Sequence, residues 1–425
     1  MKRITALLLA VMMLFALVSC GNSGETSSNE SSSQASDKVL SIDEVKKTVA
    51  AEVTAVAKDK IKIGLICLHD ENSTYDNNFI QALKEVQAEL GLTDEQVLIK
   101  NNIAESEACY NAASELADAG CNIVFADSFG HETYMIEAAK EFPEVQFCHA
   151  TGTRAQIELV SNYHNAFASI YEGRYLAGIA AGMKLNEMIE SGKITADQAK
   201  IGYVGAYNYA EVVSGMTSFF LGARSVCKTA TMKVVYTQSW FDIAKEKEAA
   251  LKLIQDGCVL ISQHADSEGA PKACEEQNVP NVAYNISTIS MGPNTALISS
   301  KIDWAPYFKM IINNVVEGKS IPTDYCGSLA DGSVKLTELN EKVAAAGTQD
   351  AIDAAAEKIK NGELNVYDIT TFTVNGATLN EYLADVVDDG TFTPDTQVVE
   401  NGVFSESTKR SAPYFDIKYI DGISE

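Results

Sequence analysis

The stretch Ile61-Lys-Ile-Gly-Leu-Ile-Cys-Leu68, followed by NNFIQALKEVQAEL at 77–90 and then by Gly91, indicates the fold. The first run is short and apolar, which predicts a buried strand. The second has apolar residues at helical spacing and stops at a glycine. The same alternation continues along the chain, with strands expected at 97–100, 122–126 and 145–149 and helices expected at 105–119 and 131–141.

The pattern restarts with a long helix expected at 167–190. The following elements are strands at 200–204, 232–237, 258–262, 281–285 and 296–299, with helices at 209–226, 242–256, 267–277 and 303–317. Strands that alternate with helices of 10–15 residues predict a parallel sheet covered on both faces. Two such runs in succession predict an α/β protein with two doubly wound, Rossmann-like lobes.

The last part of the chain has a different pattern. A helix is expected at 338–361, strand-like pieces lie at 366–374 and 413–419, and Asp-Gly and Asn-Gly pairs mark turns. We therefore expect a small C-terminal α+β appendage over 331–425. The first lobe is expected at 41–165, with a return of the chain around 286–305, and the second at 166–285, with part of 305–330.

The N-terminus carries the strongest local signal. Lys2 and Arg3 precede an almost wholly apolar run, so residues 1–19 are predicted to be a signal peptide. The run ends Leu17-Val18-Ser19-Cys20 and resembles the lipobox of bacterial lipoproteins, which implies that Cys20 is acylated. The alternative is a plain secretory signal with a chance cysteine. Residues 20–40 are rich in serine and predict a flexible tether. A capping box at 41–44 then predicts a helix through about residue 57.

Composition and charge exclude several classes of protein. The chain has 425 residues, of which 46% are hydrophobic, and its formal net charge of −25 makes nucleic acid a poor partner. The chain has no interior apolar run of about 18 residues, so an integral membrane bundle is excluded. Eight cysteines follow Cys20, none in a C-x-x-C pair. They are interpreted as small buried hydrophobes, with disulfides left open as an alternative.

No catalytic signature is present. The sequence has no P-loop, no G-x-G-x-x-G after a strand, no nucleophile elbow and no H-E-x-x-H. His69 and His131 each precede an acidic residue, but no second ligand lies at helical spacing, so no metal and no cofactor are expected. Asp70, Asp76 and Asp266 are not gathered in an enzyme motif. A binding protein is favoured over an enzyme.

Several polar and aromatic side chains follow the predicted strands, where ligands of parallel sheets bind. Ser128 and Phe129 follow the strand at 122–126, and a further set follows two strands of the second lobe: Tyr207, Asn208, Glu211 and Asp266. Asp266 has an alternative role as the N-cap of a helix that begins near residue 267.

Segments across residues 61–330 together resemble the basic membrane protein family, also called the PnrA-like solute-binding lipoproteins. In family order they are Ser73-Thr-Tyr-Asp-Asn-Asn-Phe79, Asp127-Ser-Phe-Gly-His-Glu132, Tyr171-Glu-Gly-Arg-Tyr-Leu-Ala-Gly178, Lys200-Ile-Gly-Tyr-Val-Gly205, Ser239-Trp-Phe-Asp242, Gln263-His-Ala-Asp266 and 295–304. The resemblance implies a fold like that of type I periplasmic binding proteins. It also implies that the two lobes close on a purine nucleoside or base and that an ABC permease receives the ligand.

The resemblance also implies ligand positions. Tyr75 matches an aromatic that stacks on the ligand from the first lobe, and Trp240 matches one that closes from the second. Both have the alternative of ordinary packing. Lys301 matches a lysine near the sugar, with a solvated charge as its alternative. Nucleoside binders of the family have an aspartate where this chain has Asn285, which puts ribose binding in doubt.

The sequence thus predicts a monomeric, lipid-anchored capture protein on the extracytoplasmic face of the cell membrane. Its expected partners are a purine base or nucleoside, an ABC permease and, through Cys20, the membrane. Two alternatives remain open. One is a ligand-sensing lipoprotein that signals to a membrane receptor, and the other is a surface adhesion lipoprotein.

Overall fold

The computed structural model describes residues 48–49, 53–384 and 396–425. The expected signal peptide, Cys20, tether and capping box lie outside these residues. The described part of the expected helix, residues 53–57, is not helical. Among the described residues, no helix combines the length and the apolar character needed to cross a membrane.

The first sheet has six strands in the order β11-β5-β4-β3-β1-β2, all paired in parallel. Its strands are β1 (Ile63–Ile66), β2 (Val97–Lys100), β3 (Ile123–Ala126), β4 (Gln146–Ala150), β5 (Tyr163–Ala168) and β11 (Asp324–Gly327). The helices of this lobe are α2 (Thr74–Leu90), α3 (Glu107–Asp118), α4 (Glu132–Glu141), α5 (Ala155–Glu158) and α10 (Ala305–Glu317).

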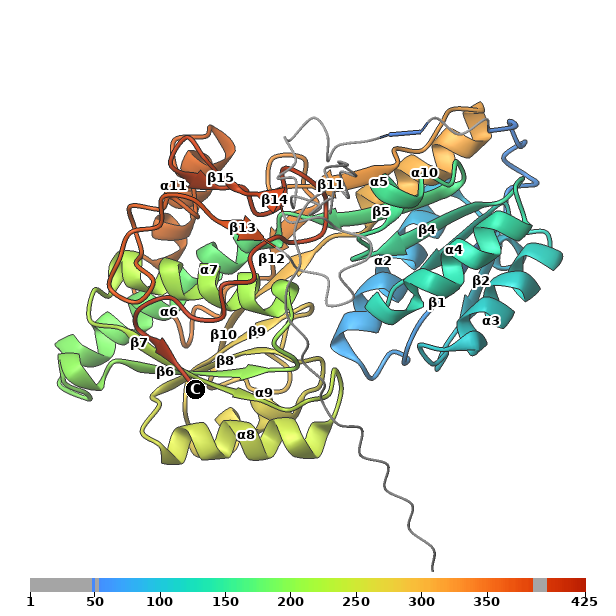
Figure 1. The fold of residues 1–425 in the computed structure, drawn as a ribbon. Helices are drawn as coiled ribbons and strands as arrows, with labels where there is room; N and C mark the ends of the chain where they lie inside the picture. The colour runs from blue at the N-terminus through green and yellow to red at the C-terminus, as the bar shows by residue number, and fades with distance from the viewer. Residues whose placement is uncertain (1–47, 50–52, 385–395) are drawn as a thin grey trace, which may run out of the picture. The chain divides into compact units, whose positions relative to one another are not determined.

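Side chains on the two faces of this sheet belong to two separate cores. Ile63 and Leu65 of β1 pack with α2 and α10, whereas Ile66 packs with α3 and α4. Because side chains alternate along a strand, one apolar run supplies both cores. The expected parallel sheet, covered on both faces, is therefore confirmed (Figure 1).

The second sheet has the order β12-β10-β9-β8-β6-β7-β17. Its strands are β6 (Lys200–Gly205), β7 (Thr231–Tyr236), β8 (Leu260–His264), β9 (Asn281–Tyr284), β10 (Ala296–Ile302), β12 (Val334–Leu336) and β17 (Ile423–Ser424). The helices are α6 (Ile170–Glu190), α7 (Ala210–Val226), α8 (Ile243–Gln255) and α9 (Gly269–Gln277). Only the β10–β12 pair of this sheet is antiparallel.

The chain crosses between the lobes in a different order from the expected one. We expected a return to the first lobe around 286–305, but β10 pairs in parallel with β9 in the second sheet. The return begins with α10, and β11 joins the first sheet, where a place in the second lobe was expected. The physical reason is the apolar stripe of α10, because Phe308 and Ile311 are buried in the core of the first lobe. Trp304, at the start of α10, stacks on Phe79 at 4.4 Å.

The chain after residue 330 is less regular than the sequence predicted. Helix α11 (Thr348–Lys360) begins ten residues later than expected, because Gly347 takes a left-handed conformation at φ 77°. The expected strands at 366–374 and 413–419 are absent from the described residues. The described strands that follow β12 have two residues each: β13 (Leu383–Ala384), β14 (Thr396–Gln397), β15 (Val399–Glu400), β16 (Val403–Phe404) and β17. Tyr367 and Phe415 belong to the same core as α6 and α7, so this segment is packed on the second lobe.

All eight described cysteines are free thiols, and all but Cys326 are buried. None of them forms a disulfide in the described residues. Their interpretation as small buried side chains agrees with this arrangement.

Glycines bring α6 and α7 unusually close together. A Cβ atom on Gly222 would lie 2.0 Å from the carbonyl oxygen of Tyr175, and one on Gly178 would lie 2.0 Å from that of Phe219. We predict that Gly222→Ala lowers the free energy of unfolding by about 3 kcal/mol, because two backbones must separate to admit the methyl group. Urea unfolding measures the change. The exposed substitution Glu187→Ala is the control, with an expected change of about 0.5 kcal/mol or less. Equal effects of both would contradict the close packing.

A second prediction concerns Glu406, which accepts a hydrogen bond from Ser214 Oγ. Burial, opposed by hydrogen bonds from Ser214 and Ser407, raises its pKa to about 7. The folded protein therefore holds this proton at pH values where the unfolded chain has lost it. Its contribution to stability falls as pH rises between the two pKa values.

We predict that the free energy of unfolding of Glu406→Gln, compared with the wild type, rises by about 2 kcal/mol between pH 5.5 and pH 8.5. Urea unfolding at the two pH values gives this difference. Glu187→Gln, on the exposed face of α6, is the matched control and should follow the wild type. A pH dependence identical in all three proteins would refute the assignment.

Candidate functional site

The candidate site is built from the loops at the carboxyl ends of the parallel strands. Leu68 and His69 follow β1, and Ser128 and Phe129 follow β3. In the second lobe, Trp240 follows β7 and Asp266 follows β8. Helix α2 begins next to the β1 loop, where Ser73 Oγ accepts a hydrogen bond from the backbone N–H of Asp76. The fold thus carries all of these side chains to one edge of each sheet.

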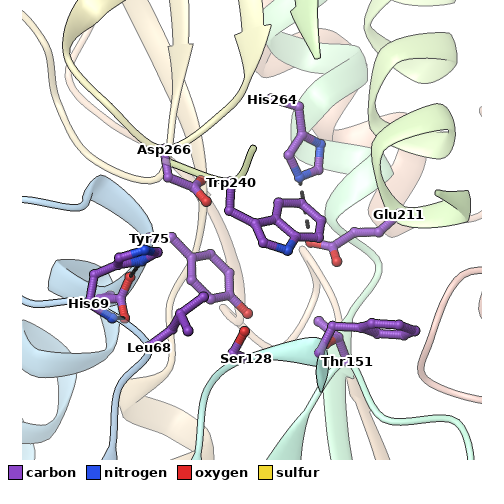
Figure 2. Close-up of a pocket in the computed structure, with 11 residues that line it drawn as sticks. Leu68, His69, Tyr75, Ser128, Thr151, Glu211, Trp240, His264 and Asp266 are labelled. Atoms are coloured by element: carbon purple, nitrogen blue, oxygen red, sulfur yellow. Dashed lines mark hydrogen bonds and ion pairs between the residues drawn. The ribbon is translucent and has the colours of Figure 1, made fainter. Parts of the chain in front are cut away.

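Both lobes line one pocket of about 360 Å³. The first lobe contributes Leu68, His69, Tyr75, Asp76, Ser128, Phe129 and Thr151, and the second contributes Glu211, Trp240, His264 and Asp266. Figure 2 shows Tyr75, Trp240 and Asp266 pointing toward a common space. This volume includes space open to solvent.

The two aromatic side chains are fixed by their surroundings. The hydroxyl of Tyr75 donates to the backbone carbonyl of Asp127 at 2.8 Å, which holds its ring against the first lobe. The indole of Trp240 packs on Tyr207 and Tyr209, with ring centroids 5.1 and 6.0 Å away. Tyr75 from the first lobe and Trp240 from the second are therefore preorganised at the pocket.

Asp266 is almost fully buried, with 5% of its surface exposed. Asn285 Nδ2 donates to its Oδ1 at 3.3 Å. Burial, reinforced by the charges of Glu246, Asp76 and Glu211, raises the pKa of Asp266 well above its usual range. Among the described residues Asp266 forms no ion pair, although the charge of Arg174 is near enough to oppose the rise in its pKa. Its carboxyl group can form hydrogen bonds to a neutral ligand.

Glu211 and His264 form a second polar group at the pocket. The Nε2 atom of His264 lies 3.5 Å from Glu211 Oε1. Burial and the nearby charge of Arg174 lower the pKa of His264 to about 4, despite the opposing effect of Glu211. The imidazole is therefore neutral at pH 7. Glu211 keeps its acceptor capacity for a ligand.

Three possible metal ligands lie close together in the floor of the first lobe. Ligand atoms of Cys67, Asp76 and Asp127 lie within 4.8 Å of one another. Burial, followed by the nearby charges of Asp127 and Asp76, raises the pKa of the Cys67 thiol well above its usual range. The pKa of Asp127 is also raised well above its usual range, mainly by burial and then by the charge of Asp76.

The lobes touch each other across the pocket. The backbone N–H of Thr74, the first residue of α2, donates to the carbonyl of Asp266 at 2.8 Å. The rings of His69 and Phe241 lie 5.4 Å apart, and those of Phe129 and Tyr209 lie 5.9 Å apart. The structure therefore represents the lobes closed on the site.

The structure brings together most of the residues that the sequence singled out. Those that line the pocket are Tyr75, Ser128, Phe129, Glu211, Trp240 and Asp266. Tyr207 supports Trp240, and Asn285 holds Asp266. Asp266 does not cap a helix, because α9 begins at Gly269 with Glu268 as its N-cap residue.

Two predicted site residues lie elsewhere. Asn208 lines a neighbouring pocket and accepts a hydrogen bond from the hydroxyl of Tyr236. Lys301 lines neither pocket, because its position on β10 lies opposite Lys335 of the antiparallel strand β12. The structure thus gives no support to a ligand contact from Lys301.

Sequence reasoning missed five residues of the pocket, which are Leu68, His69, Asp76, Thr151 and His264. Leu68, His69 and Thr151 come directly after the ends of β1 and β4, so the rule that selected Ser128 would have found them. His264 is the last residue of β8. Asp76 is the third residue of α2, and only the fold shows that its carboxylate turns into the pocket.

Two curated relatives are similar to this chain. A protein of Brucella abortus (strain 2308) named purine-binding protein is 32% identical over 74% of this chain and 85% of its own length. A protein of Haloferax volcanii, provisionally named ABC transporter glucose-binding protein, is 33% identical over 60% of this chain and 61% of its own length.

A solved structure has the same fold. It is an ABC transporter solute-binding protein from Conexibacter woesei, with a TM-score of 0.58, 19% identity, and coverage of 72% of this chain and 98% of that one. The family model for PnrA-like ABC transporter substrate-binding proteins matches residues 65–370. The match includes every residue of the candidate pocket and most of both sheets, but not β17. The chain belongs to the PnrA-like (Bmp) family of ABC transporter substrate-binding proteins, whose members bind solutes outside the cytoplasm.

Proposed function

We propose that this solute-binding protein captures a purine base or nucleoside and delivers it to an ABC permease. The observation that carries the proposal is the composition of the pocket. An aromatic side chain from each lobe, Tyr75 and Trp240, stands beside the carboxyl groups of Glu211 and Asp266.

The charges that line the pocket favour a neutral ligand. No lysine or arginine is among the residues that line it, whereas Asp76, Glu211 and Asp266 are. An anionic ligand would find no cation to pair with and would lose its hydration, which is costly. A purine is neutral and planar, and its ring and amino N–H groups need acceptors that carboxyl oxygens supply.

Stacking supplies affinity for such a ring. A base that stacks on an aromatic side chain gains about 1–3 kcal/mol, largely independent of the base. A ligand held by Tyr75 and Trp240 together would also stabilise the closed arrangement of the lobes, because it contacts both. The name of the Brucella relative supports a purine, whereas the name of the Haloferax relative refers to glucose. The binding measurement described next therefore includes both purines and glucose.

We predict that Trp240→Ala weakens purine binding by about 10- to 100-fold, because the stacking energy from the second lobe is lost. Trp240→Phe keeps an aromatic face and should retain most of the affinity. The measurement is calorimetric titration of protein stripped of co-purified ligand, with adenine, guanine, hypoxanthine, their nucleosides, glucose and amino acids.

Binding of glucose or an amino acid in place of every purine would overturn the proposed ligand. Purine binding that Trp240→Ala leaves unchanged would overturn the proposed site. If no member of the panel bound, an adhesion lipoprotein would replace the proposal.

We also propose that the protein is a lipoprotein anchored through Cys20, on the strength of the lipobox-like sequence Leu17-Val18-Ser19-Cys20. Cells labelled with radioactive palmitate should yield labelled protein in the membrane fraction. Cys20→Ser should abolish the label and release the protein. Cys326→Ser removes a cysteine of the folded part and should keep the label. Retention of label in Cys20→Ser would contradict the anchor.

A further inference from the structure

A second, larger chamber continues from the candidate pocket. It encloses about 1520 Å³, including space open to solvent, and shares Phe129, Thr151, Glu211 and Trp240 with the first pocket. A ligand bound beside Trp240 can therefore extend into the chamber without leaving the cleft.

Three segments form the walls of the chamber. The first lobe contributes the start of α4, including Thr133, and the loop at 151–154. The second lobe contributes residues 208–211 at the start of α7. The third wall is the segment 410–416, through Arg410, Ala412, Pro413 and Asp416. This third wall lies outside the part of the chain that matches the family, residues 65–370.

Hydrogen bonds hold the third wall against the first lobe. The backbone N–H of Ser411 donates to Asp324 of β11 at 2.7 Å, and its hydroxyl donates to the other oxygen of the same carboxylate. Nearby, the hydroxyls of Ser169 and Ser407 lie 2.9 Å apart. The wall is therefore fixed in place and does not depend on the ligand for its position.

Arg410 is a buried cation in the wall of the chamber, and one of its donor atoms has no partner among the described residues. Its side chain is held by the carbonyls of Ala412 and Pro413, and its guanidinium lies 4.1 Å from the centre of the Tyr414 ring. Only 5% of the residue is exposed, and its Nη1 atom has no hydrogen-bond partner among the described residues. Within those residues Arg410 also forms no ion pair. A buried guanidinium N–H without an acceptor costs free energy, so a ligand oxygen that accepts its hydrogen bond would stabilise the complex.

We propose that this chamber is a second subsite, in which Arg410 binds an oxygen-rich substituent of the purine, either a ribose or a ribose phosphate. The inference rests on the proposed function, because it places the purine ring in the first pocket. It differs from the sugar position that the family resemblance implies. Asn285 is bound to Asp266, and Lys301 lines neither pocket.

The chamber differs from the first pocket in having arginines among its lining residues. Acids and aromatic rings line the first pocket, with no lysine or arginine among its lining residues, and this suits a neutral ring. The chamber is lined by Arg154 and Arg410 together with the acids Glu132, Glu211 and Asp416. Guanidinium groups bind hydroxyl, carboxylate and phosphate oxygens through directed N–H donors. Arg154 already forms an ion pair with Glu158, so Arg410 is the cation available to the ligand.

The test is a calorimetric comparison of guanine, guanosine and guanosine 5′-monophosphate, repeated with adenine and its two derivatives, on the mature chain. In the wild type, we expect a derivative to bind at least about tenfold more tightly than its free base. A gain already present in the nucleoside indicates ribose, and a gain only in the monophosphate indicates phosphate. Either result supports the subsite.

Arg410→Gln should remove this gain while leaving free-base affinity within about twofold of the wild type. Thr133→Trp fills the chamber from the other wall and should have the same effect, which guards against a local folding defect in Arg410→Gln. Arg224→Gln is the matched control, because Arg224 also bonds a backbone carbonyl and lies over an aromatic ring, but lines neither pocket. It should leave all affinities unchanged.

The outcomes separate the two proposals. If free bases bind but their derivatives bind no more tightly, or if the gain survives in both variants, the subsite is refuted and purine capture stands. If no purine binds to the wild type, the proposed function fails and the subsite fails with it.

Discussion

The carboxyl ends of parallel strands determine where this protein can bind anything. In each sheet the strands point the same way, so the loops that follow them gather at one edge. His69, Ser128 and Thr151 reach the pocket from the first sheet in this way, and Trp240 and Asp266 reach it from the second. The hydrogen bond from Thr74 to the carbonyl of Asp266 joins these two edges directly. The topology of the sheets thus determines where the pocket lies, and the side chains determine what it can bind.

The pocket composition then limits the chemistry of the ligand. Burying a carboxyl group without a nearby cation costs free energy of folding. A ligand that forms hydrogen bonds to such a group can offset this cost. Asp266 receives one hydrogen bond from Asn285 and keeps its remaining capacity, and Tyr75 and Trp240 bring aromatic surface from opposite lobes. Each of these groups would gain from a planar, neutral ring with N–H donors. The chamber beyond Trp240 adds a different chemistry through Arg410, from a segment that the family match does not include.

Much of the fold could be predicted from the sequence, because apolar runs and helical spacing are local signals. Strand β2 was predicted to the residue, whereas β5 was missed because His164 and Asn165 interrupt its apolar pattern. The His164 imidazole is bonded to a distant partner, Gln146, which no local pattern reveals. The predicted order in which the chain passes between the two lobes was wrong for a similar reason. Helix α10 belongs to the first lobe because its apolar side chains pack in the core of that lobe. The sequence of α10 does not show which of the two sheets it packs against.

The site was predictable to the extent that it follows strand ends. Ser128, Phe129 and Asp266 could be found by that rule, and the family resemblance added Tyr75 and Trp240. Lys301 was predicted from a match of residue type, which does not show where a side chain points, and it lines neither pocket. Arg410 could not be found at all, since its segment has little regular structure and is held at the cleft by contacts between residues distant in the sequence, such as Ser411 with Asp324.

The central claim is that a purine ring lies between the two lobes beside Tyr75 and Trp240. A crystal structure of the protein with its tightest-binding ligand tests this most directly. The account predicts electron density for a purine ring stacked against both aromatic side chains, with a ring or amino nitrogen within hydrogen-bond distance of Asp266. Density for a sugar in that pocket, or a purine bound away from Trp240, would contradict it.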